Sequence, residues 1–156
     1  MTVTLYSLAA RFLGVHEIAG HADHPLIQWW LSRVDLPIAT HDEIAWCSAF
    51  VAGIAWQLDL PRSESASARS WLHIGSPVAS LDVAQPKAFD VVILTRGNPP
   101  QPPASVLNAQ GHVGILADVD RTGARVQLLG GNQGDAVSVQ WFNADRILGI
   151  RRLWSA

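Results

Sequence analysis

The chain has 156 residues, of which 49% are apolar and 15% are charged, and its formal net charge is -2 at pH 7. This length and apolar content predict one domain over residues 1–156 with a sizeable buried core. The near balance of 11 basic and 13 acidic side chains argues against a nucleic-acid partner and against an anionic membrane surface.

The N-terminal stretch is apolar but has no features of an export signal. In "MTVTLYSLAARFLG" no basic leader precedes the apolar residues, and Arg11 stands among them. No apolar run is long enough to form a transmembrane segment. We therefore expect synthesis in the cytoplasm without a signal peptide, and any action in the periplasm or cell wall to follow delivery or lysis.

The first half of the chain shows helical periodicity. Apolar residues recur at helical spacing in 5–13 and in 25–34, and 63–75 is predicted as a shorter helix that Gly75 closes. The segment "THDEIAWCSAFVAGIAWQLDLP" is apolar on nearly all sides, which is typical of a buried, central helix.

The start of this third helix has two interpretations. Thr40 and Glu43 have the spacing of a capping box, whereas the dense apolar pattern begins nearer Ala45 or Trp46. The later start would bring Cys47 close to the helix N-terminus.

The second half changes to the periodicity of strands. The links "DRTG" and "GGNQGD" suit hairpins, so the sheet is expected to be mostly antiparallel. Helices followed by strands indicate the α+β class, here with N-terminal helices packed on an antiparallel sheet of about five strands. The Pro-rich segment "RGNPPQPPASVLNAQ" is expected to be a surface loop. The predicted strands are 90–94, 112–119, 124–129, 136–142 and 147–153.

Cys47 is the single cysteine, so it has no partner for an internal disulfide. On the apolar stripe of a buried helix, a cysteine is more often a small core residue than a nucleophile. Close to a helix N-terminus, however, free backbone N–H groups and the helix dipole favour the thiolate. The role of Cys47 therefore depends on which residues lie beside it.

His112 and Asn132 are candidate partners for that thiol. Gly111 and Gly114 flank His112, and we expect them to leave open space for a substrate. Asn132 lies in "GGNQG", a sequence that is typical of a turn. Pairing of the two strands would bring His112 and Asn132 to the same edge of the sheet. A thiol, an imidazole base and a polar group that orients the ring are together the requirements of cysteine catalysis.

Five segments in this order resemble a known family: "AWCSAFV", "SARSWL", "FDVVIL", "GHVGIL" and "LGGNQGDAVSV". They are similar to the CHAP and NlpC-like peptidoglycan hydrolases of the papain fold, particularly a phage-associated subfamily of short single-domain members. The resemblance runs from "FLGVHEIAG" to "ILGIRRL". Each segment alone is weak, but the combination is specific.

The resemblance implies roles for individual residues. Cys47 matches the nucleophile, His112 the base, and Asn132 the polar residue that orients the histidine. Many CHAP members have a glutamate two residues before that asparagine, where this chain has Gly130, so Gln133 is the alternative orienting residue. Trp46, Gly111 and Gln133 are expected to contact substrate, and no metal or cofactor is implied.

The implied reaction is hydrolysis of an amide bond in the stem peptide of bacterial peptidoglycan. The protein would be an endopeptidase or an N-acetylmuramoyl-L-alanine amidase, which use the same three residues. As an endolysin or a delivered antibacterial effector, it would have a delivery apparatus or an immunity protein as further partners.

Two other hypotheses use other residues. His16, His21 and His24, with Asp23 among them, could suggest a metal site, but their spacing fits no zinc pattern and loop histidines are the better interpretation. The seven tryptophans could suggest a non-catalytic cell-wall-binding domain on the same fold. Five of them are expected in the core, since they lie on predicted helices: Trp29, Trp30, Trp46, Trp56 and Trp71.

Overall fold

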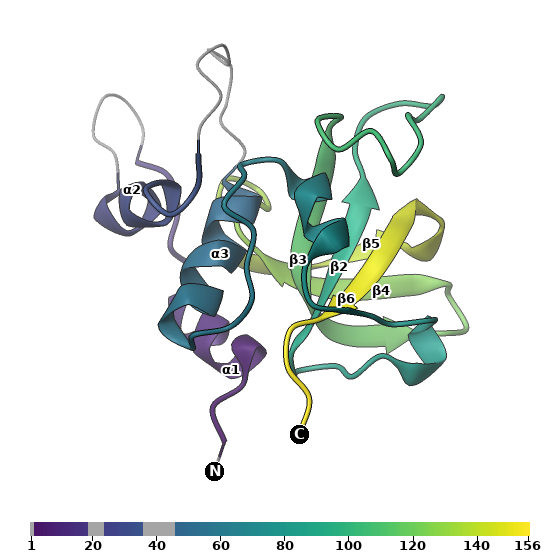
Figure 1. Ribbon diagram of the computed structural model, residues 1–156, viewed down its shortest axis with the longest axis horizontal. Helices are drawn as coiled ribbons and strands as arrows, with labels where there is room; N and C mark the ends of the chain where they lie inside the picture. Colours follow the sequence, from purple (N-terminus) through teal and green to yellow (C-terminus); the bar gives the residue numbers. More distant parts are fainter. Residues whose placement is uncertain (1, 19–23, 36–45) are drawn as a thin grey trace.

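The structure is a computed structural model that describes residues 2–18, 24–35 and 46–156. In Figure 1 the α-helices gather on one side and the sheet on the other. The α-helices are α1 (Leu5–Ala9), α2 (Pro25–Leu31) and α3 (Cys47–Gln57). The 3-10 helices are η1 (Ala10–Phe12), η2 (Ala68–His73), η3 (Leu81–Val83) and η4 (Ala144–Arg146).

The sheet has six strands in the order β1-β6-β2-β3-β4-β5, and every pairing is antiparallel. The α+β class is therefore confirmed. The five predicted strands are present, and the sixth is a two-residue strand, too short to show a periodicity. The strands are β1 (Ser76–Pro77), β2 (Asp90–Thr95), β3 (Gly111–Asp120), β4 (Arg125–Gly130), β5 (Ser138–Asn143) and β6 (Ile147–Arg152).

The two faces of the sheet carry separate apolar clusters, because side chains alternate along a strand. The face that packs against α3 includes Val91, Ile93, Val113, Ile115 and Leu129. The opposite face carries Val92, Leu94, Leu116, Val126, Leu128 and Ile150, with Phe142 packed against them. On α3, residues 47–55 are all buried, as the apolar pattern of the sequence predicted.

The helix α3 packs closely on α2. A Cβ atom at Gly53 would lie 2.4 Å from Cδ1 of Trp30, so only glycine permits this approach. Trp30, Trp46 and Trp71 lie in the core, as predicted. The prediction for Trp56 is wrong: it is 45% exposed, in the last turn of α3, where its ring lies against Trp29. Trp29 itself is only partly buried, packed against the core.

The structure decides the start of one predicted helix and corrects another. The helix α3 begins at Cys47, with Trp46 as its N-cap, so the later of the two predicted starts is the observed one; Thr40 and Glu43 lie outside the described residues. The predicted helix 63–75 forms only the 3-10 helix η2. Serine hydroxyls explain the difference, since Ser63 and Ser65 each accept a hydrogen bond from the backbone N–H two residues later and so compete with helix formation.

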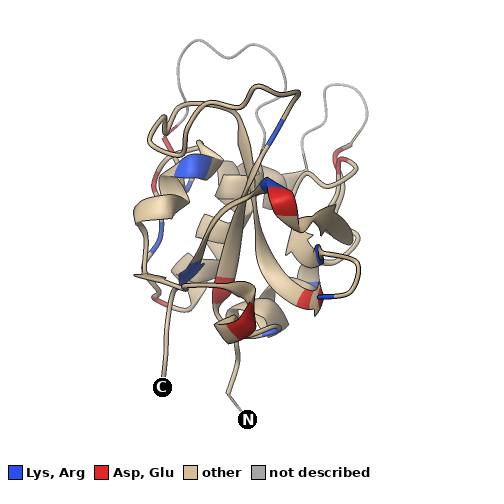
Figure 2. Ribbon diagram, turned by 90° about the vertical axis from the view of Figure 1, so that its right-hand side faces the viewer, with Lys and Arg blue, Asp and Glu red and all other residues tan. Residues whose placement is uncertain are grey.

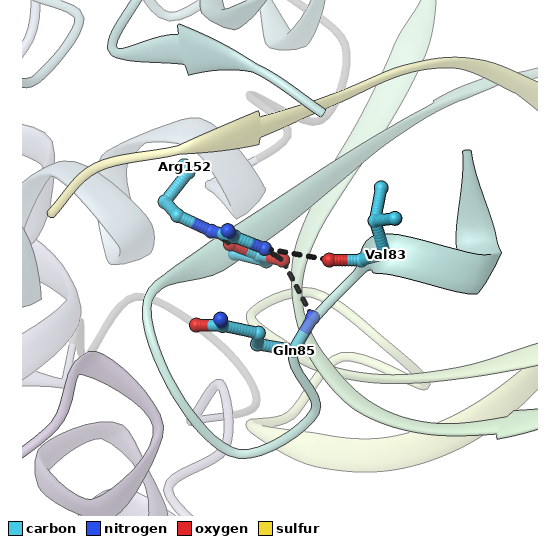
Figure 3. A network of polar contacts seen from close by, with 4 residues as sticks. Val83, Gln85 and Arg152 are labelled. Atoms are coloured by element: carbon cyan, nitrogen blue, oxygen red, sulfur yellow. Dashed lines mark hydrogen bonds and ion pairs between the residues drawn. The ribbon is translucent and has the colours of Figure 1, made fainter. Parts of the chain in front are cut away.

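An ion pair fixes the start of β2 to the end of β6. Arg152 donates from Nε and Nη2 to the two carboxylate oxygens of Asp90, at 2.7 and 2.8 Å. Asp90 also accepts from the backbone N–H of Gln85, and Arg152 donates to the carbonyl of Val83 (Figure 3). Asp90 raises the pKa of Arg152, since its carboxylate binds the charged guanidinium.

Charges are spread over the molecule without a single-sign tract in the view of Figure 2, where blue and red segments are interspersed. Among the described residues, no helix combines the length and the apolar character needed to cross a membrane.

Candidate active site

The candidate site lies where α3 begins and β3 starts, at the end of the sheet reached by the loop 96–110 (Figure 1). Cys47 is the first residue of α3 and is 1% exposed. The next residue, Ser48, fixes this turn. Its hydroxyl donates to the carbonyl of Ser65 at 2.7 Å and accepts from Nε1 of Trp71 at 2.8 Å. The thiol is thus held on a rigid helix terminus.

The side chain of His112 acts directly on the thiol of Cys47. Burial raises the pKa of the thiol, but several groups together lower it by more. These are the hydrogen bond and the charge of His112, followed by the backbone N–H groups of Val113 and Ser48. The net result is a pKa below that of an ordinary cysteine, which favours the nucleophilic thiolate.

The other side of the imidazole is held by Gln133. Nε2 of His112 lies 2.8 Å from Oε1 of Gln133. The amide nitrogen of Gln133 donates to the carbonyls of Leu128 and Ser138, at 3.1 and 2.7 Å, so its oxygen is the atom that faces the ring. Because that oxygen can only accept, Nε2 carries the proton, and Nδ1 is left for the thiol of Cys47.

Asn132 does not make the predicted contact with the histidine. Its backbone has a φ of 58°, so it forms the turn between β4 and β5, and the hydrogen bond to the ring comes from the next residue, Gln133. The predicted meeting of His112 with this turn therefore occurs, but through the alternative residue.

Gly130 makes room for the amide of Gln133. A Cβ atom at position 130 would lie 2.5 Å from Oε1 of Gln133 and 3.4 Å from Nε2 of His112. The space that a side chain at position 130 would fill is thus taken by the amide that holds the histidine. Glycine at position 130, where many CHAP members have a glutamate, leaves the space that the side chain of Gln133 occupies.

Trp46 and Gly111, two of the residues expected to contact substrate, are both buried and closely packed. Trp46 is 2% exposed, stacks on Trp30 and donates from Nε1 to Glu17 at 2.6 Å, so it is a core residue. A Cβ atom at Gly111 would lie 3.1 Å from Cγ of Arg69, and one at Gly114 would lie 2.8 Å from Cβ of Leu128. The expectation of open space beside His112 is wrong at both glycines, because they permit close packing instead.

Arg69, which the sequence did not single out, connects η2 to the loop before β3. It is fully buried, and it donates to the carbonyls of Gln110, Pro102 and Pro103 at 2.9 to 3.0 Å. Within the described part of the chain, its Nη2 has no hydrogen-bond partner. The loop 96–110 is mostly exposed, as predicted, but Arg69 fixes it beside the residue that precedes His112.

Phe142 and Arg146 were also not found from the sequence. The ring of Phe142 lies 5.4 Å from that of His112, tilted by 33°. The guanidinium of Arg146 lies over the same phenyl ring, 5.4 Å from its centroid. Phe142 lies on β5 and Arg146 on η4, and both are distant in sequence from His112. Apolar periodicity does not predict contacts of this kind.

The loop histidines have local partners. His24 caps α2 by accepting from the backbone N–H of Leu26, and Nδ1 of His16 lies 3.0 Å from the carbonyl of Gly14. His21 and Asp23 lie outside the described residues. Within the ranges that the structure describes, no three histidine, cysteine, aspartate or glutamate side chains are grouped as metal ligands.

Comparison with known proteins supports the fold. No protein-family model matches the chain, and no curated protein matches it. Among solved structures, the chain is similar to NlpC1 from Trichomonas vaginalis, with a TM-score of 0.50 and 16% sequence identity over 97% of this chain. The matched region is 44% of that protein's chain. At this identity the likeness shows the fold alone, an NlpC-type papain-like fold.

Proposed function

We propose that the protein is a thiol hydrolase that cleaves an amide bond in the stem peptide of bacterial peptidoglycan, with Cys47 as nucleophile and His112 as general acid and base. One observation carries the proposal: the thiol at the start of α3 meets an imidazole whose other nitrogen is held by Gln133, and its pKa is lowered. The sequence resemblance to CHAP and NlpC-like hydrolases supports the choice of substrate.

The proposed reaction has two steps. The Cys47 thiolate attacks the carbonyl carbon, and a carbon–sulfur bond forms while the carbon–nitrogen bond breaks and His112 protonates the leaving amine. His112 then takes a proton from water, whose oxygen attacks the thioester and releases the free acid and the thiol. The backbone N–H of Cys47, in the first turn of α3, would stabilise the oxyanion.

Gln133 has a supporting role in this mechanism. Its carbonyl oxygen fixes the ring of His112 and stabilises the imidazolium that forms, as the third member of a triad does. A neutral amide suffices, since the thiolate and the imidazolium already compensate each other. We propose Gln133 for this role in place of Asn132.

Hydrolysis of purified peptidoglycan tests the proposal. The wild-type protein is expected to release soluble fragments whose masses and new end groups identify the bond that is cut. Cys47→Ala should lower the rate on the order of 10⁴-fold or more with its thermal melt unchanged. Cys47→Ser separates this function from the alternative, a cell-wall-binding domain. A pure binder retains its function in this variant and releases no fragments in the wild type.

We further propose that the protein acts beyond the inner membrane after delivery or lysis, as an endolysin or an antibacterial effector. The same Cys47→Ala variant tests this in a Gram-negative host, with and without an added periplasmic signal peptide. Toxicity only of the exported wild-type protein supports the proposal. Equal toxicity in the cytoplasm would contradict a peptidoglycan substrate.

A further inference from the structure

Arg146 is an anchored arginine without a carboxylate partner. Its Nε and Nη2 both donate to the carbonyl of Thr95, at 3.2 and 2.8 Å, and its guanidinium lies over the ring of Phe142. The ion pairs among the described residues are those of Arg121, Arg125 and Arg152. The neighbouring Asp145 is exposed and makes no ion pair with Arg146. The guanidinium is therefore fixed in place, and none of the residues that the structure describes accepts a hydrogen bond from its Nη1.

Two neighbours connect this guanidinium to the surroundings of His112. Thr95, which holds it, is the strand partner of Gly111, the residue before His112. Phe142, on which it lies, is packed 5.4 Å from the imidazole. Phe142 packs against the apolar cluster on the face opposite α3, so the contacts that run from His112 through Phe142 to Arg146 lead away from the helix that carries Cys47.

The position of Arg146 relative to His112 suggests which part of the substrate it could bind, an argument that rests on the proposed function. His112 delivers a proton to the leaving amine, so the part of the substrate that extends past His112 is the leaving fragment. A fixed guanidinium with free N–H donors matches the geometry of a carboxylate. Because the anchors at Thr95 and Phe142 already hold the side chain, little conformational entropy is lost when it binds.

We propose that Arg146 is a specificity residue that binds a carboxylate on the substrate fragment whose amine leaves. The protein would then prefer stem peptides in which this carboxylate is free over those in which it is amidated. Arg125 offers a matched control within the same chain: it lies 5.1 Å over the ring of Trp141, but it is already paired with Asp120 at 3.2 Å.

The test uses two synthetic stem peptides that differ only in a free or an amidated carboxylate on the leaving fragment. The wild-type protein is expected to have a kcat/KM about tenfold to a hundredfold higher for the free acid, mainly through KM, because one charged hydrogen-bonding contact has this strength. Arg146→Gln should abolish the difference between the peptides, Arg146→Lys should retain part of it, and Arg125→Gln should leave it as in the wild type.

Each outcome decides the proposal. If Arg146→Gln lowers the rates for both peptides equally, the residue only holds Thr95 and Phe142, and the proposal is overturned. Equal cleavage of both peptides by the wild type overturns the carboxylate contact and leaves the hydrolase intact. Cleavage of neither peptide, together with no release of fragments from peptidoglycan, overturns the hydrolase itself. Should Arg146→Gln fold poorly, the wild-type preference and its decrease at high salt remain the measurement.

Discussion

The two ends of strand β2 use buried polar groups in opposite ways. At its first residue, Asp90 is 1% exposed and has its carboxylate paired with Arg152 and with a backbone N–H. Near its last residue lie a thiol with a lowered pKa, an arginine with an unpartnered Nη2 and a second arginine without a carboxylate. At the first residue, which we call the closed end, every polar group is paired. At the last residue, which we call the open end, Nη2 of Arg69 and Nη1 of Arg146 have no acceptor among the described residues.

This difference separates stability from function. Buried polar groups in folded proteins are nearly always hydrogen-bonded, and exceptions call for an explanation. Arg152 follows the rule and stabilises the junction of β2 and β6. Arg69 departs from it within the packing around His112, and sites that carry chemistry are where such departures are expected.

The largest expected effect is on the open end, from His112→Ala. Hydrolysis should fall on the order of 10⁴-fold, because both proton transfers are lost. The pKa of the Cys47 thiol should rise, since burial raises it and only the N–H groups of Val113 and Ser48 would then oppose burial. The pH dependence of alkylation by iodoacetamide measures this. In the wild type the midpoint should lie below the roughly 8.5 of a free thiol, and a variant with an unchanged midpoint would remove His112 from the site.

The next effect concerns the closed end. Arg152→Met should lower the free energy of unfolding by roughly 3 kcal/mol, because it leaves the carboxylate of Asp90 buried without its cation. Denaturant titration measures the loss, and the alkylation profile of Cys47 should stay unchanged. Arg121→Met is the control: Arg121 and Asp82 form an exposed pair, so the change should be under about 1 kcal/mol. A shifted thiol pKa in Arg152→Met would show that the two ends are coupled.

A smaller effect is expected from Gln133→Ala. Loss of the amide that orients His112 should lower kcat about tenfold to a hundredfold with little change in KM, since a buried hydrogen-bond partner is removed from the base. Asn132→Gly is the matched control, because glycine keeps the positive φ of that residue and removes only the side chain. If Asn132→Gly loses more activity than Gln133→Ala, the roles of the two residues are reversed.

The sequence predicted the elements better than the site. Five strands and the buried character of α3 follow from apolar periodicity, which reports burial directly. The start of α3 did not follow from it, since the sequence left two positions open. The predicted hairpin brought His112 to the turn after β4. Periodicity is silent about η2, where serine hydroxyls replaced an α-helix with a 3-10 turn, and about a strand of two residues.

The remaining site residues depend on packing that no local pattern encodes. The sequence predicts open space at Gly111, but the side chain of Arg69, 42 positions earlier in the chain, fills it. Phe142 contacts His112 only because β3, β4 and β5 are neighbours in the sheet, and Arg146 is held between Phe142 and Thr95 of β2. Gln133 could be found from the sequence, because Gly130 stands where the resembling family often has a glutamate. The missing side chain raises the question of which residue takes its place.

The pairing of Gly130 with Gln133 also constrains how such a site can change over evolutionary time. One location beside the imidazole can be reached from two positions in the chain, and only one side chain fits there. A glutamate introduced at 130 would collide with the existing amide, and loss of that amide first would leave the ring without an acceptor. A change from an amide at position 133 to a carboxylate at position 130 therefore requires substitutions at both positions. A comparison of position 130 alone would wrongly suggest that this chain has no residue to orient the histidine.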